Sequence, residues 1–189
     1  TFAAVFMTPL LTRWLAGTVA VAMSLYHMWA TAMAPPEALI FRGSHLLFAL
    51  LLVYLLYPVA VRPDGQRRWW GIDALLILAS MAVVGHIFIT YQAITNRIIY
   101  IDDLSTRDQL MAVLALGLVL DATRRVIGWA LPITAMLFLA YALLGTDIKL
   151  QVLLEQMYLS TEGIFGSTLG VSATYVIVFV LFGSFMEKS

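Results

Sequence analysis

Residues 74–96 read ALLILASMAVVGHIFITYQAITN and contain no Asp, Glu, Lys or Arg. As an α-helix, such a run crosses the hydrocarbon core of a bilayer, which takes about 20 apolar residues. A helix on the surface of a soluble protein would instead carry a charged face. The stretch therefore predicts a transmembrane helix over residues 73–95.

Five further segments are free of charged residues in the same way: Trp14–Ala34, Gly43–Val61, Gln109–Leu120, Val126–Thr146 and Gly163–Met186. An ionised side chain at mid-bilayer costs roughly 2.5–3.5 kcal/mol on insertion scales, which explains why the charges fall between these segments. The alternating pattern of a membrane β-barrel is missing, so we expect an all-α, polytopic transmembrane fold. The six expected spans are residues 12–34, 43–61, 73–95, 107–124, 126–145 and 163–186.

The composition excludes several classes of function. Of the 189 residues, 62% are hydrophobic and 12% are charged, whereas a soluble domain has about a quarter charged residues. The net charge of zero leaves no basic face for nucleic acid, and the absence of cysteine excludes disulfides and thiolate sites. No phosphate-binding loop, nucleophile elbow or pair of catalytic carboxylates is present. We therefore expect a membrane protein in contact with lipid that is not an enzyme and has no catalytic, cofactor-binding or metal-binding residues.

A charge cluster divides the fourth and fifth expected spans. A single helix over residues 107–145 would be nearly 60 Å long at about 1.5 Å per residue, twice the thickness of the bilayer core. The break at Asp121-Ala-Thr-Arg124-Arg125 is therefore expected to be a tight reversal at a membrane interface. Asp121, Arg124 and Arg125 form either a structural ion-pair cluster or a positively charged anchor at the membrane surface.

The segment Ile148–Tyr158 differs from the spans. Leu150, Leu153, Leu154 and Met157 recur at helical spacing, and the polar residues Lys149, Gln151, Glu155 and Gln156 fall elsewhere on the helix. This pattern predicts a short amphipathic helix that lies in the interface.

The charges of the loops predict the orientation. The side of the N-terminus collects Arg13, Arg62, Arg67, Arg68, Arg124, Arg125 and Lys188. The opposite side collects Arg42, Arg97, Arg107 and Lys149, diluted by seven acidic residues: Glu37, Asp102, Asp103, Asp108, Asp147, Glu155 and Glu162. Seven basic residues against four predict a cytoplasmic N-terminus.

Small residues line the start of the last expected span. Gly163, Gly166 and Gly170 share one stripe, and Gly166 and Gly170 form a GxxxG pair. Such a stripe allows close approach of another helix, so we interpret these glycines as helix-packing residues rather than substrate contacts.

Two histidines, His27 and His86, lie deep in expected spans. Each is interpreted either as a neutral imidazole bonded to a neighbouring helix or as a proton relay or haem ligand. His45, near the start of the second expected span, is expected to be interfacial.

Several stretches resemble one family of transporters. The closest is residues 161–189, TEGIFGSTLGVSATYVIVFVLFGSFMEKS, followed by Arg42–Pro58, Tyr91–Arg97 and Asp121–Pro132. They are similar to the tripartite ATP-independent periplasmic (TRAP) transporters. The similarity is greatest to fused permeases, which combine the small and large membrane subunits and work with TAXI-type binding proteins.

The resemblance implies a domain organisation and a function. Residues 1–125 correspond to the small-subunit-like four-helix region, and residues 126–189 to the first two spans of the large subunit. Family members import organic acids or amino acids with an ion gradient, usually of Na⁺, after a periplasmic protein delivers the substrate. The cation sites lie in a transport domain beyond these residues, so the chain is expected to be an N-terminal, scaffold fragment of an inner-membrane permease that binds no Na⁺ itself.

Two alternatives come from other classes of protein. One is a redox membrane subunit in which His27 and His86 ligate a haem. The other is a stand-alone membrane assembly protein.

Overall fold

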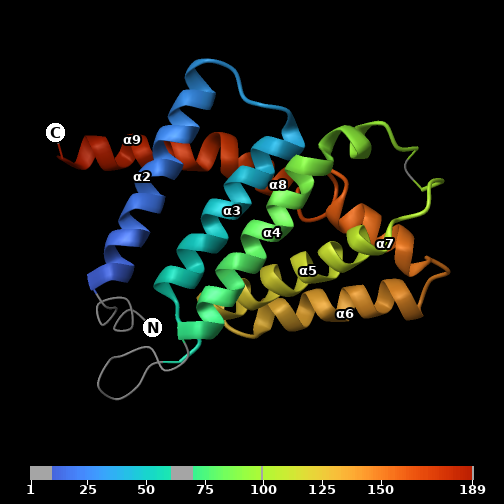
Figure 1. Cartoon of the computed structure of the whole chain (residues 1–189). Coiled ribbons are helices and arrows are strands. Elements are labelled where there is room, and N and C mark those ends of the chain that lie inside the picture. Colours follow the sequence, from blue (N-terminus) through green and yellow to red (C-terminus); the bar gives the residue numbers. More distant parts are fainter. Residues whose placement is uncertain (1–9, 61–69, 99, 189) are drawn as a thin grey trace.

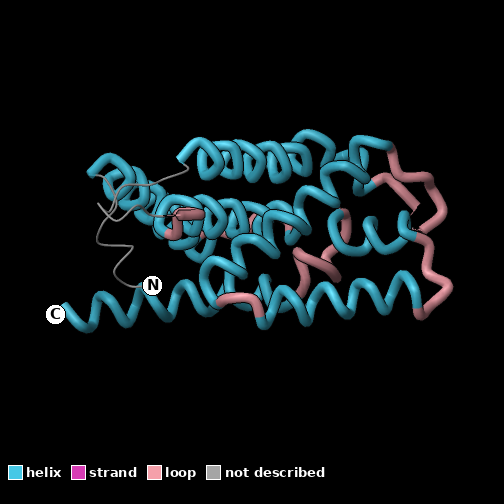
Figure 2. The backbone as a smooth tube through the Cα atoms, turned by 90° about the horizontal axis from the view of Figure 1, so that it is seen from below, coloured by secondary structure: helices cyan, strands magenta, loops and turns pink. Residues whose placement is uncertain are grey.

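The computed structural model describes residues 10–60, 70–98 and 100–188, and these ranges contain helices and loops but no strand. The all-α prediction is therefore confirmed (Figures 1 and 2). The elements are α2 (Leu10–Ala32), α3 (Ala38–Leu56), α4 (Trp70–Thr95), α5 (Thr106–Ile127), α6 (Ala130–Leu144), α7 (Leu150–Tyr158), α8 (Ser167–Val171), the π-helical turn η1 (Ser172–Val176) and α9 (Ile177–Lys188). Arg62, Arg67 and Arg68, on which the predicted orientation partly depends, lie outside the described residues.

Three helices in the described ranges are long and apolar enough to cross a membrane. They are Ala38–Leu56, Gly71–Thr95 and the combined helix Ser167–Glu187. Helix α6 is apolar but shorter, and α2 and α5 are not among these three. The architecture is that of an α-helical membrane protein.

The second expected span was placed too far along the chain. Helix α3 begins at Ala38, where the Glu37 carboxylate caps it by accepting a 2.9 Å hydrogen bond from the Leu39 amide. It ends at Leu56, shortly before Pro58, because the residue that precedes a proline is disfavoured in helical conformation. Arg42 is therefore inside the helix, although its charge had indicated a loop.

The expected reversal between the fourth and fifth spans occurs later than predicted. Helix α5 continues through the charge cluster to Ile127 and is capped by Gly128, whose φ of 99° is in the left-handed region that favours glycine. Helix α6 then returns beside α5 (Figure 1). The cluster at Asp121–Arg125 is therefore the last part of a helix, not the turn itself.

Helix α3 is the centre of the packing, in contact with α2, α4, α5, α8 and η1. The main core joins α3, α4, α5 and α7 around the fully buried side chains of Tyr54, Ile87, Tyr158 and Phe165. The short helix predicted within Ile148–Tyr158 is present as α7, and it packs on α5. Tyr158 at its end donates a 2.7 Å hydrogen bond to the Val83 carbonyl of α4.

The last helical stretch begins at Ser167, so the expected start at residue 163 is wrong. It is interrupted by η1 and continues as α9, which lies across α2 (Figure 1). Many apolar side chains of α9 are exposed, among them Phe179, Phe182 and Phe185. The described helices therefore leave an apolar surface uncovered.

Candidate functional site

Polar side chains form three buried or half-buried networks between the helices. We call them the Arg125 network (Asp73, Asp121, Arg124 and Arg125), the Arg97 network (His86, Arg97, Asp108 and Glu155) and the histidine chain (His27, His45 and Ser172). Each joins elements that are far apart in the sequence.

The Arg125 network joins the start of α4 to the end of α5. Nη1 of Arg125 lies 2.6 Å from Oδ1 of Asp73, and its Nε lies 2.7 Å from Oδ2 of Asp121. Arg124 makes a second pair with Asp121, with Nη2 2.6 Å from Oδ1. The Arg125 and Asp73 side chains are only 4% and 1% exposed, so the charges are paired away from solvent.

The same network also holds the end of α3. Nη1 of Arg125 donates a 2.9 Å hydrogen bond to the carbonyl of Tyr57, and the guanidinium lies 4.8 Å from the centre of the Tyr54 ring. Arg124 lies 5.2 Å from the ring of Trp129. The Arg125 guanidinium therefore connects α3 and α4 to its own helix, α5. A planar group with several N–H donors can make such contacts in several directions at once. The sequence indicated Asp121, Arg124 and Arg125 but not Asp73, whose only signal was an acidic residue at the start of an apolar run.

The Arg97 network lies where the loop after α4 meets α5 and α7. Nε2 of His86 donates a 2.8 Å hydrogen bond to Oδ1 of Asp108, and the Ser105 hydroxyl donates one of 2.8 Å to Oδ2 of the same carboxylate. Oγ of Ser105 also caps α5 by accepting a 3.2 Å hydrogen bond from the Asp108 amide. Arg97 pairs with two carboxylates: its Nη1 lies 3.5 Å from Oδ2 of Asp108, and its Nη2 lies 3.6 Å from Oε1 of Glu155.

Glu155 was expected to lie on the polar side of the short helix. It is instead 3% exposed, because its carboxylate accepts a 3.1 Å hydrogen bond from the Tyr100 amide and pairs with Arg97. Nearby, burial and the Asp108 carboxylate raise the pKa of the Tyr158 hydroxyl, so it stays protonated and can donate to Val83.

The histidine chain lies between α2, α3 and η1. Nδ1 of His27 is 2.7 Å from the carbonyl of Met23, and Nε2 of His27 is 3.0 Å from Nδ1 of His45. Nε2 of His45 is in turn 3.1 Å from Oγ of Ser172. Both rings are buried, so the expectation that His45 is interfacial is wrong: it lies two turns inside α3 and packs against α2.

The two deep histidines of the sequence have separate partners. His27 contacts His45, whereas His86 contacts Asp108 and stacks on Tyr158. No hydrogen bond or ring contact joins His27 to His86 within the part of the chain that the structure describes. Nε2 of His27 is already bonded to Nδ1 of His45, and Nε2 of His86 to Oδ1 of Asp108, so the geometry gives no support to a haem held between these two side chains.

The three glycines of the predicted stripe have different surroundings. Gly163 lies in the turn before α8, where an added Cβ would come within 2.4 Å of the Met157 backbone. Gly166 is the N-cap of α8, and a Cβ added there would meet the backbone of the turn that precedes this helix. Gly170 is on the helix, and an added Cβ would lie 2.8 Å from Nε of Arg42. The helix-packing role remains a prediction.

Arg42, which the charge pattern places in a loop, lies in α3 and binds the turn before α8. Its Nη1 donates a 2.8 Å hydrogen bond to the carbonyl of Phe165, and it lies 3.4 Å from the carbonyl of Thr161. Because Phe165 is fully buried, the contact fixes the turn before α8 on the centre of the bundle.

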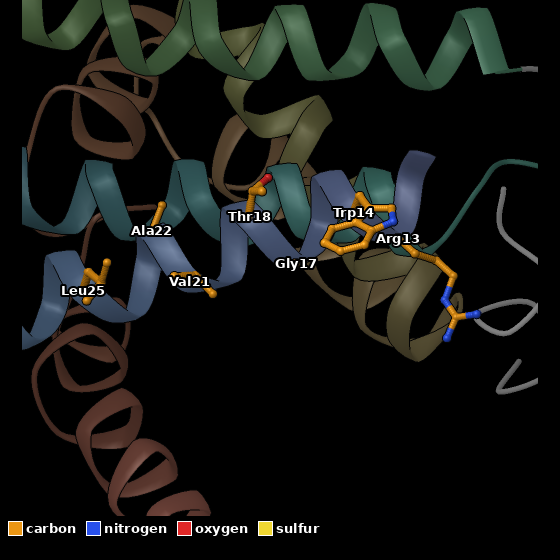
Figure 3. A pocket seen from close by; sticks show the side chains of 7 residues that line it. All are labelled: Arg13, Trp14, Gly17, Thr18, Val21, Ala22 and Leu25. Carbon is orange, nitrogen blue, oxygen red and sulfur yellow. The ribbon is translucent and has the colours of Figure 1, made fainter. Parts of the chain in front are cut away.

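A groove of about 800 Å³ runs along the exposed face of α2 (Figure 3). Arg13 and Trp14 lie at one end of the groove and Leu25 at the other (Figure 3). Gly17 leaves its middle open, since an added Cβ there would meet nothing within 4 Å. The groove is almost entirely apolar, which suits contact with a lipid chain or another transmembrane helix.

Long apolar helices with charges paired at their ends define a multi-pass α-helical membrane protein. Residues 114–189 match the family model of the tripartite ATP-independent periplasmic transporter, DctM component. The match supports a permease of the TRAP transporter family, and a transporter component agrees with the expectation of a protein that is not an enzyme. No curated protein and no solved structure was found to match the chain.

Proposed function

We propose that this chain is the scaffold of a TRAP permease of the fused, TAXI-associated type. Residues 1–125 would take the place of the small membrane subunit, and residues 126–189 would begin the large one. The permease imports organic acids or amino acids, which a periplasmic binding protein delivers, and an inward ion gradient drives the uptake.

The observation that carries the proposal is where the buried polar contacts fall relative to the family match. The match begins within α5 and continues through α9. Each of the three networks joins a residue that precedes the match to a residue within it, through the contacts Asp73–Arg125, Arg97–Glu155 and His45–Ser172. Arg42 adds a fourth such contact at Phe165. A part with DctM similarity is thus fixed to the preceding helices by side chains from both, which supports one rigid scaffold in a single chain.

The uncovered apolar surface supports contacts with other membrane components. Trp14 of α2, Phe138 of α6 and Phe179 of α9 are 69%, 70% and 72% exposed, respectively. A surface of this kind is ordinarily covered by lipid or by other helices of the same assembly. We assign it to membrane lipid and to the transport domain of the permease.

The coupling ion is assigned to that transport domain. No group of three or more His, Asp or Glu side chains that could hold a metal ion occurs in the described ranges. The acidic residues that do cluster are paired with Arg97, Arg124 or Arg125. We therefore propose that Na⁺ binds elsewhere in the permease.

The proposed orientation places the N-terminus in the cytoplasm of a bacterial or archaeal cell and the Arg97 network toward the periplasm. The chain has no cysteine, so single cysteines can be introduced and labelled without a background. A membrane-impermeant maleimide should label Asp103→Cys from the periplasm in intact cells and Arg13→Cys only after permeabilisation. The reverse pattern would refute the orientation.

The function is tested by uptake into proteoliposomes that contain the native full-length permease. A panel of labelled organic acids and amino acids is offered with and without the periplasmic binding protein, and with and without an inward Na⁺ gradient. Uptake of at least one substrate that needs both additions would support the proposal. Uptake that is indifferent to the binding protein would contradict it.

A further inference from the structure

The histidine chain has a property that the scaffold role does not require. We propose that the His27–His45 pair is a binding site for one proton, and that Ser172 completes the site from η1. The site would connect the N-terminal helices α2 and α3 with the family-matched region through a titratable hydrogen bond.

The partners fix the proton positions of the neutral pair. A carbonyl oxygen can only accept, so Nδ1 of His27, 2.7 Å from the Met23 carbonyl, must carry a hydrogen. In a neutral ring Nε2 of His27 is then an acceptor, and Nδ1 of His45 at 3.0 Å must be the donor. Nε2 of His45 is left as an acceptor for the hydroxyl of Ser172 at 3.1 Å. With two neutral rings, this is the one arrangement that forms all three hydrogen bonds.

The same geometry has room for one additional proton. If Nε2 of His45 gains a hydrogen, it becomes a donor, and the Ser172 hydroxyl rotates to accept its hydrogen bond. The hydrogen between the rings can then move from Nδ1 of His45 to Nε2 of His27, which transfers the positive charge without breaking a contact. At the other end, the Met23 carbonyl offers no such exchange. A proton therefore enters or leaves at Ser172.

A second proton does not fit. It would leave an N–H on Nε2 of His27 facing an N–H on Nδ1 of His45 across 3.0 Å. Two positive charges in contact would repel each other in surroundings that exclude water. The pair is therefore expected to titrate as a unit that takes up one proton, and not as two independent imidazoles.

Among the described residues, helices α2, α3 and α8 and the turn η1 contain no Asp or Glu that could balance a second charge. Apart from the two histidines, the ionisable groups on these elements are Tyr26 of α2, Arg42 and Tyr54 of α3 and Tyr175 of η1, and Glu37 caps the start of α3. Arg13 of α2 lies near that helix's start, and α9 carries Glu187 and Lys188 at its C-terminal end. Aromatic rings enclose His27 instead, with the centres of Tyr26 and Phe41 5.3 and 5.4 Å away. Such rings stabilise a single cation by cation–π attraction.

The position of Ser172 links the proton to the backbone. Ser172 begins the π-helical turn, and its carbonyl accepts the hydrogen bond from the Ile177 amide that closes this turn. π-Helical turns occur mostly as single turns inside α-helices and often at functional sites. A change of hydrogen-bond role at Ser172 thus acts at the joint between α8 and α9, where the helix leaves the bundle (Figure 1).

The test is ¹⁵N NMR of histidine side chains in the full-length protein in lipid bilayers, recorded from pH 8 to pH 3.5. At pH 8 both rings should show a protonated Nδ1 and an unprotonated Nε2. As the pH falls, we expect the signal of one imidazolium per pair of rings. Two imidazoliums, or two rings that stay neutral throughout while the protein remains folded, would overturn the proposal.

Variants locate the proton and supply the control. Ser172→Ala removes the group that accepts from the protonated pair, and the imidazolium signal at a given pH should fall about tenfold, as expected for a lost hydrogen bond to a charged group. Ser172→Thr keeps a hydroxyl and should retain the signal. His86→Gln removes a histidine bonded to Asp108 and should leave the signal of the pair unchanged. An unchanged signal in Ser172→Ala, with the neutral-state spectrum intact, would refute the role of Ser172.

Discussion

Arg125 in α5 reaches back to Asp73 at the start of α4, with Nη1 2.6 Å from Oδ1, and both side chains are almost completely buried. The pair joins a helix of the family-matched region to a helix that precedes it. The pair lies where α3 and α5 end and where α4 begins, and Arg125 also donates to a carbonyl just after α3. It therefore holds the termini of three helices together.

Replacement of Arg125 by methionine should destabilise the protein by about 3–5 kcal/mol, because Asp73 would keep a buried charge without its partner. The free energy of unfolding is measured in mixed micelles by titration with a denaturing detergent. Arg107→Met is the control, since Arg107 is exposed and such a change should cost less than about 0.5 kcal/mol. The double variant Asp73→Leu/Arg125→Met should recover most of the loss, and a double variant as unstable as the single one would argue against the pair.

Gly170→Ala should weaken the attachment of the turn before α8. The added Cβ would lie 2.8 Å from Nε of Arg42, so Arg42 must move away from the Phe165 carbonyl, at a cost of about 1–3 kcal/mol. Gly117→Ala is the matched control: its Cβ meets nothing within 4 Å, and alanine in place of a helical glycine should stabilise by about 0.5–1 kcal/mol. In Arg42→Ala, where the obstacle is gone, the Gly170→Ala change should become nearly neutral. The free energy of unfolding is measured for the single and double variants, and additive losses would show that the two residues do not interact.

Glu155→Gln should loosen the loop after α4 without unfolding α7. The carboxylate accepts from the Tyr100 amide and pairs with Arg97, and a neutral amide replaces both contacts poorly. Hydrogen exchange at residues 100–103 should become about tenfold faster, which corresponds to the loss of one charge-assisted hydrogen bond. Glu162→Gln, at an exposed position, should leave the exchange unchanged. Equal exchange in both variants would mean that Glu155 does not hold the loop.

The segregation of charge was sufficient to predict an all-α membrane fold, because apolar length decides which segments can cross a bilayer. It was a poor guide to where helices begin and end. The charge pattern places Arg42 and the cluster at Asp121–Arg125 in loops, yet both lie inside helices, where other elements pair with them. A charge marks a loop only when nothing across the fold can pair with it.

The interior polar contacts were predicted only where partners are close in sequence. Asp121, Arg124 and Arg125 were recognisable as one cluster because they are close in the chain, although the sequence placed them in a turn and not on one face of a helix. Asp73, Glu155 and Ser172 were missed because their partners lie on helices distant in the chain. His45 was misplaced for the same reason: its position in the sequence says nothing of His27, which the packing of α2 on α3 brings to it.

Reconstitution of residues 1–189 alone shows whether these helices are a scaffold or a transporter by themselves. Proteoliposomes with this chain are offered the substrate panel, the binding protein and an inward Na⁺ gradient, beside liposomes with the native full-length permease. We expect residues 1–189 to insert into the membrane and to take up no substrate, whereas the full-length permease takes it up. Uptake by residues 1–189 alone, above that of empty liposomes, would contradict it.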